Sequence, residues 1–190
     1  AHSSPTAVAA DAPARGIHLG FDTADARVQG NGWLVPGVAG QALQLDGIAA
    51  HVVVPSAEVP PLAGSFAVEG WVALGAYPFN DAPLLQQQDG ESVGFFLGVG
   101  DRGQVRFDVA AGGRRLTVVS QANLALRHWA HVAGVFEEGK GATLYVNGQT
   151  AGVAAGPGPF VQATRSDLWI GRNAYEMEQS APVGHGRQQP

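Results

Sequence analysis

Apolar and polar residues alternate along most of the chain. The stretch FAVEGWVAL (66–74) places Phe66 and Val68 on one face of an extended strand and Glu69 and Trp71 on the other. Such period-two alternation is typical of half-buried strands, and helical periodicity is scarce. Other strands predicted in this way are 51–55, 94–99, 104–109, 115–120 and 167–171. Because clusters of Gly, Pro, Asn and Asp separate these stretches, about a dozen short strands are expected.

A meander of three strands is predicted between residues 129 and 155. The sequence EEGKG (137–141) interrupts the alternation with charge and glycine, as a hairpin loop does. The pair Asn147-Gly148 is a strong two-residue turn signal, because both positions need positive φ. The polar residues of this segment are therefore expected to lie on the surface of a sheet and at the tip of a loop.

Composition supports an all-β domain that does not bind nucleic acid. The chain has 190 residues, of which 45% are hydrophobic and 14% charged, with 27 glycines and 12 prolines. Abundant glycine fits many tight turns. The net charge of −5 and the lack of a basic run argue against nucleic-acid binding. No apolar stretch is long enough to predict a membrane span, and the lack of cysteine excludes disulfides.

The order of these segments resembles the LamG-like jelly roll of the concanavalin A-like lectin/glucanase superfamily. The stretches that carry the resemblance are GFD (20–22), GQALQLDGIAAHVVVP (40–55), FAVEGWVAL (66–74), GFFLGV (94–99), HWAHVAGVFEEGKGATLYVNGQTAG (128–152) and DLWIGRN (167–173). The resemblance implies a two-sheet antiparallel jelly-roll sandwich that recognises carbohydrate or protein surfaces. It also implies a structural calcium ion in some relatives. The segment LGAYPFNDAPLLQQ (74–87) is similar to modules that precede fructan-acting glycoside hydrolases.

Three parts of the chain are expected. Residues 1–15 form a flexible leader, left by signal-peptide removal or by a cloning or processing artefact, residues 16–173 form the sandwich, and residues 174–190 form a tail or linker. The last strand of the family pattern is missing here. Either the chain is a fragment of a larger protein, or another segment or molecule fills the gap. We therefore expect the strand near Gly16–Asp22 to lack a neighbour or to borrow one.

Candidate binding residues lie in the YPFND segment. Tyr77, Phe79, Asn80 and Asp81 combine exposed aromatic rings with polar groups, as a sugar site requires. The strand tryptophans are expected in the core, because burying an aromatic ring is strongly favourable. These tryptophans are Trp71, Trp129 and Trp169. His131 is likewise expected to face inward with its ring hydrogen bonded, and it lies on the opposite face from His128 if both are in a strand.

The sequence predicts no catalytic site and at most a calcium site. Glu69 is a lone strand carboxylate, whereas glycoside hydrolysis needs a pair. Asp22 and Asp46, in the family-like GFD and LDG stretches, are the candidate calcium ligands. The alternative is that they cap turns through side-chain hydrogen bonds.

The sequence therefore predicts a secreted, non-catalytic recognition module that binds a glycan or a companion protein domain. One alternative is a structural unit completed by strand exchange with another chain. Another is the accessory N-terminal module of a secreted fructan-type glycoside hydrolase.

Overall fold

The computed structural model describes residues 16–25 and 27–172, and within them the chain is built from β-strands. The elements are β1 (Val28–Gln29), β2 (Trp33–Pro36), β3 (Gln41–Gln44), β4 (His51–Val54), the 3-10 helix η1 (Ser56–Glu58), β5 (Phe66–Val72), β6 (Ala82–Gln88), β7 (Gly94–Val99), β8 (Gln104–Ala111), β9 (Arg114–Asn123), β10 (Ala130–Glu137), β11 (Gly141–Val146), β12 (Gln149–Ala155) and β13 (Leu168–Ile170). The expected leader, and the tail from residue 174, lie outside these residues.

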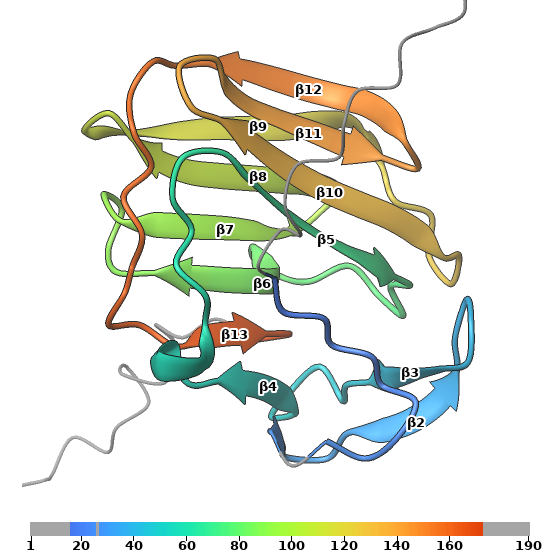
Figure 1. Cartoon of the computed structure of the whole chain (residues 1–190). Coiled ribbons are helices and arrows are strands. Elements are labelled where there is room, and N and C mark those ends of the chain that lie inside the picture. Colours follow the sequence, from blue (N-terminus) through green and yellow to red (C-terminus); the bar gives the residue numbers. More distant parts are fainter. Residues whose placement is uncertain (1–15, 26, 173–190) are drawn as a thin grey trace, which may run out of the picture.

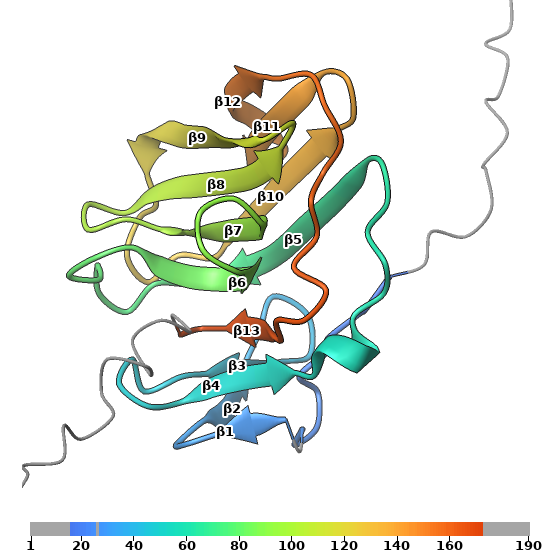
Figure 2. The ribbon, with the colours of Figure 1, turned by 90° about the vertical axis from the view of Figure 1, so that its left-hand side faces the viewer.

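Two antiparallel sheets form the sandwich. One has seven strands in the order β1-β4-β13-β6-β7-β8-β9, and the other has four in the order β12-β11-β10-β5. The hairpin β2-β3 forms a separate two-stranded sheet. Figure 1 shows the four-stranded sheet in front of the upper strands of the larger sheet, and Figure 2 shows the same layers from the side. The predicted all-β, two-sheet antiparallel sandwich is confirmed.

The core lies between the two sheets and follows the predicted alternation. On β8, Val105, Phe107 and Val109 are fully buried and face the smaller sheet. Burial of a phenylalanine side chain contributes about 2–3 kcal/mol. Gly134 on β10 lets the Phe107 ring approach the backbone, since a Cβ atom there would lie 2.4 Å from a ring carbon. The two sheets therefore approach each other closely at this point.

The smaller sheet leaves the lower part of the larger sheet uncovered, and irregular segments fill that space. Leu19, Val59 and Leu62 pack against the core from segments outside the strands. Residues 16–25 run below β5 on this side of the larger sheet (Figures 1 and 2). The predicted strand at Gly16–Asp22 is therefore wrong, because this segment makes a hydrophobic contact without joining a ladder.

Local turn chemistry matches the prediction. Asn147 and Gly148 have φ angles of 50° and 75° and connect β11 to β12. The Asn147 side-chain oxygen also accepts a hydrogen bond from the His131 backbone N–H at 2.9 Å. Residues 138–140 form the turn between β10 and β11, as expected for a charged loop tip.

The part of the chain that the structure describes has no helix of the length and hydropathy needed to cross a membrane.

The Phe107 contact predicts unequal effects of two glycine substitutions in the smaller sheet. Gly134→Ala should lower the free energy of unfolding by about 1–3 kcal/mol, because the new methyl group overpacks against the ring. Gly70→Ala on β5 is the matched control, since a Cβ atom there meets nothing within 4 Å. Urea denaturation measures both values, and equal stabilities would contradict the proposed close packing.

Candidate functional site

A polar depression lies on the outer face of the seven-stranded sheet, away from the core. Its volume is about 400 Å³, within the range of small-ligand sites. The side chains that line it and carry its chemistry are Asp81, Gln88, Phe96, Arg106, Asp108 and Arg115. They come from β6, β7, β8 and β9 and from the segment just before β6.

Strand register brings these residues together. Phe96 on β7 pairs with Asp108 on β8, and Arg106 pairs with Gly98. Side chains two residues apart share a face, so Arg106 and Asp108 both point outward while Phe107 points into the core. On β9, Arg115 pairs with Ala110 and therefore joins the same face.

Arg106 is held in place by two carboxylates and a ring. Its Nε donates to Asp108 Oδ1 at 3.1 Å, its Nη2 lies 2.8 Å from Asp108 Oδ2, and its Nη1 donates to Asp81. The hydrogen bond to Asp108, together with the attraction of Asp108 and Asp81, raises the pKa of Arg106. The guanidinium carbon lies 5.9 Å from the centre of the Phe96 ring. Because Gly98 has no side chain, that ring can lie against the strand.

Arg115 ties the depression to the turn between β6 and β7. Its guanidinium donates to Asp108 Oδ2 at 3.2 Å and to Gln88 Oε1 at 3.3 Å. It also donates to the backbone oxygens of Glu91 at 2.8 Å and Gly90 at 3.0 Å. Asp108 is only 2% exposed and accepts bonds from two guanidiniums, so it is the centre of the network.

The predicted YPFND residues divide into different roles. Asp81 reaches the depression and pairs with Arg106. The Tyr77 hydroxyl donates to the Leu124 backbone oxygen at 2.8 Å and so anchors the loop. Asn80 is exposed, and Phe79 is fully exposed two residues before Asp81. The sequence analysis did not identify four residues of the site, which are Phe96, Arg106, Asp108 and Arg115. The alternation along β8 shows that Arg106 and Asp108 point outward. It does not show which residues of the neighbouring strands lie beside them, because that depends on strand register.

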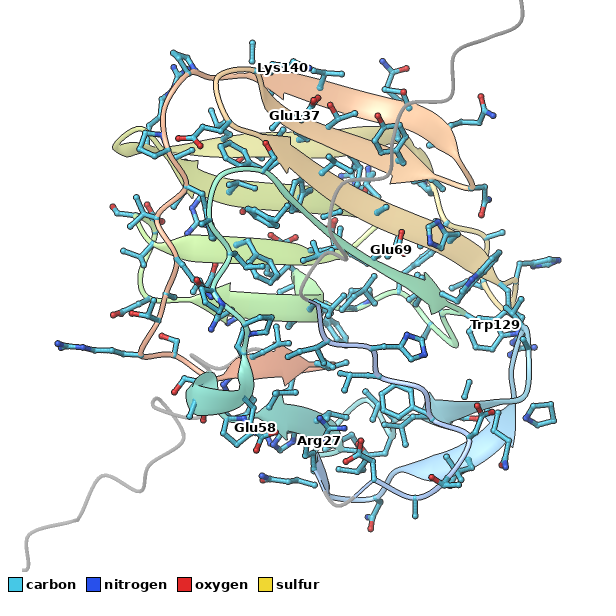
Figure 3. All side chains as sticks on the ribbon, in the orientation of Figure 1. Arg27, Glu58, Glu69, Trp129, Glu137 and Lys140 are labelled. Atoms are coloured by element: carbon cyan, nitrogen blue, oxygen red, sulfur yellow. The ribbon has the colours of Figure 1, made fainter. Side chains whose placement is uncertain are left out.

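The predictions that placed the strand tryptophans and His131 in the core are wrong. Trp71 is 55% exposed and Trp129 is 38% exposed. His131 lies on the outer face of the smaller sheet, 5.3 Å from Trp71 between ring centres and 3.5 Å from the Glu69 carboxylate. Figure 3 labels Glu69 and Trp129 on this side. The core covers only one face of this sheet. Because successive side chains of a strand point to opposite faces, these residues lie on the face that the core does not cover.

Trp169 also points away from the core. It pairs with Gln86 on β6 and stacks on His51, with ring centres 5.1 Å apart and planes 18° apart. Its neighbour Leu168 is the one that enters the core. His128 lies in the bend before β10, outside any strand.

The two candidate calcium ligands make local hydrogen bonds. Asp46 Oδ1 accepts the backbone N–H groups of residues 48, 49 and 50 at 2.8–2.9 Å, and these bonds lower the pKa of Asp46. Asp22 Oδ1 accepts the Gln41 N–H at 2.9 Å. Among residues 16–25 and 27–172, no three His, Asp or Glu side chains are grouped to hold a metal. Calcium binding by Asp22 and Asp46 stays a prediction.

Comparison with known proteins identifies the same architecture. Residues 46–183 match the family model described as the concanavalin A-like lectin/glucanases superfamily. No curated protein sequence matches the chain. Domain 4 of AbnA, a GH43 extracellular arabinanase from Geobacillus stearothermophilus solved in complex with arabinotriose, is 14% identical with a TM-score of 0.55; the match covers 76% of this chain and 68% of that one.

Two further solved structures are similar to the chain. The binding domain of Paraclostridial Mosquitocidal Protein 1 is 14% identical with a TM-score of 0.53, covering 81% of this chain and 45% of that one. The carbohydrate binding module CBM66 from Bacillus subtilis is 14% identical with a TM-score of 0.42, covering 75% of this chain and 89% of that one.

The Asp108 network predicts that the two carboxylates bound to Arg106 contribute unequally to stability. Asp108→Asn should lower the free energy of unfolding by about 2–3 kcal/mol, because the carboxylate is buried and has two charged partners. Asp81→Asn should cost less than about 1 kcal/mol, since Asp81 is 42% exposed. Urea denaturation at neutral pH compares the two variants; a larger loss for Asp81→Asn would contradict the assignment of Asp108 as the centre.

Proposed function

Because the chain belongs to the concanavalin A-like lectin/glucanase superfamily, we propose that it is a non-catalytic glycan-binding module and that the depression on β6 to β9 is its sugar site. The observation that carries the proposal is the joined set of Arg106, Asp108 and Asp81. The fully exposed ring of Phe79 belongs to the same segment, two residues before Asp81 in the chain. The fold alone does not carry it, because one fold hosts many functions.

The chemistry of the depression suits a sugar. A sugar hydroxyl donates one hydrogen bond and accepts others, so it pairs with both a carboxylate oxygen and a guanidinium N–H. Arg106 and Asp81 offer these groups side by side, and both are partly exposed. A phenyl ring offers an apolar surface for the C–H face of a sugar. Phe79 provides such a ring at the end of the loop that carries Asp81.

Binding fits the arrangement better than hydrolysis. Glycoside cleavage uses one carboxyl group as a proton donor and a second as nucleophile or base. Here Asp108 is only 2% exposed and its oxygens are bonded to the guanidinium groups of Arg106 and Arg115, so only Asp81 of the two carboxylates can meet a ligand. Glu69 lies on the other sheet and faces His131.

We extend the proposal to an extracellular setting, as an accessory module of a secreted glycoside hydrolase. The support is the shared fold with domain 4 of an extracellular arabinanase and the resemblance of residues 74–87 to modules of fructan-acting enzymes. Arabinan and fructan oligosaccharides are therefore the first sugars to test.

The assembly alternative has one observation in its favour. β5 pairs with β10 on one side and with no second strand among the described residues, so it is the edge of the smaller sheet. An edge strand exposes backbone groups that can pair with another chain. Light scattering over a range of protein concentrations tests this: the glycan-binding proposal predicts a monomer, and a stable dimer would favour assembly.

The sugar-binding proposal predicts a large effect of Phe79→Ala. A glycan array that includes arabinan and fructan oligosaccharides should show binding, and the substitution should weaken it about tenfold, equivalent to about 1.4 kcal/mol. The fold should be unaffected, because Phe79 is fully exposed.

Trp71→Ala is the matched control, since Trp71 is an exposed aromatic residue on the opposite sheet. Binding lost in Trp71→Ala and kept in Phe79→Ala would move the site to the smaller sheet. Absence of binding to every glycan on the array would overturn the proposal.

A further inference from the structure

The outer face of the larger sheet continues beyond the depression. Asp108 pairs with Phe96, Phe96 with Gln86, and Gln86 with Trp169, so these four residues form one row across β8, β7, β6 and β13. Neighbouring strands lie about 4.8 Å apart, so Gln86 is about 10 Å from Asp108 along the row. A ligand longer than one sugar ring could therefore lie over both positions.

Gln86 is buried but has no hydrogen-bond partner among the residues that the structure describes. Its side chain is 1% exposed, and both its amide nitrogen and its amide oxygen are buried without a partner. Buried polar groups in native proteins are nearly always hydrogen bonded, so an amide with two unused groups requires an explanation.

His51 presents a second unused group beside the same tryptophan. Its ring is 4% exposed and stacks on Trp169, and its Nε2 is buried without a partner in residues 16–25 and 27–172. Its Nδ1 lies 2.6 Å from the Ala49 backbone oxygen. Because a carbonyl oxygen only accepts, Nδ1 is the donor in this contact, and Nε2 is the ring nitrogen left to meet a ligand.

The neighbouring glutamine differs. Gln87 is also 1% exposed, but it points to the inner face of the sheet. Its Nε2 donates to the Ser166 backbone oxygen at 2.9 Å, and its Oε1 accepts from Gln162 at 3.3 Å. The two adjacent glutamines therefore differ: the amide of Gln86, on the outer face, has unused groups, whereas the amide of Gln87, on the inner face, is hydrogen bonded.

We propose that Gln86 and His51 form a second sugar subsite, continuous with the depression, which binds a hydroxyl group of a further sugar residue. This inference rests on the proposed function. A hydroxyl supplies the missing partners: it donates to His51 Nε2 or Gln86 Oε1 and accepts from Gln86 Nε2. The module then prefers a segment of an oligosaccharide to a single sugar.

Trp169 is the neighbour of both groups. It is half-buried, it stacks on His51 and its strand position is paired with Gln86, so a sugar bound at the subsite changes the surroundings of its indole. Binding of a trisaccharide should therefore change the tryptophan emission, and Trp169→Phe should remove that change.

The test compares Gln86→Leu with Gln87→Leu, two substitutions of similar volume at adjacent buried positions. Calorimetry with arabinose, arabinotriose, fructose and inulotriose should show that Gln86→Leu weakens trisaccharide binding at least tenfold and changes monosaccharide binding less than twofold. In thermal unfolding, Gln86→Leu should leave the Tm unchanged or raise it. Gln87→Leu should lower the Tm by about 2–4 °C or more, because it removes the hydrogen bonds of the Gln87 amide to Ser166 and Gln162.

Three outcomes would overturn the subsite. Unchanged trisaccharide binding would show that Gln86 does not meet the sugar. An equal loss of affinity for monosaccharides and trisaccharides would show that Gln86 affects binding only through the depression. A Tm loss as large as that of Gln87→Leu would show that a buried water, and not a sugar hydroxyl, satisfies the amide. Failure of the proposed function gives a different result from these three outcomes, because the unmodified protein would then bind no sugar. In that case the assignment of the subsite to a sugar would also be wrong.

Discussion

The close contact between Phe107 and Gly134 sets the relation between the two sheets. The ring of Phe107 lies against the backbone of β10, where any side chain would collide with it. Once Phe107 is fixed inward, the two-residue period of the strand places Arg106 and Asp108 on the opposite face. Packing of the core and construction of the polar depression are therefore consequences of the same register.

The two faces of the larger sheet have different physical roles. The inner face buries aliphatic and aromatic side chains, which contributes most of the stability. The outer face brings charged groups close together, and their desolvation is compensated by direct pairing of Arg106 and Arg115 with Asp108. Such a network gives little net stability, but it holds polar groups at defined positions. That property suits recognition of a ligand with many hydroxyl groups.

The smaller sheet has a different character. One of its faces is core and the other carries Trp71, Glu69 and His131 in partial contact with solvent. The alternation of β5 correctly placed Glu69 and Trp71 on a shared face, yet the expectation that an aromatic strand residue is buried was wrong for Trp71. A strand pattern identifies two faces, whereas the arrangement of layers decides which of them is covered. The same reasoning explains Trp169, which belongs to a strand but packs on His51 outside the core.

The sequence by itself determined strands β4, β5 and β7 to β13, the Asn147-Gly148 turn and the inward set on β8, because each depends on neighbours within a few residues. It also supplied Asp81, through the local composition of the loop before β6. Only the tertiary structure decided that Asp81 meets Arg106, 25 residues away, and that Gln86 lies between Phe96 and Trp169. These contacts depend on the register between neighbouring strands, which turn geometry and the buried face fix together. The pattern of one strand alone does not state which residue of the next strand lies opposite it.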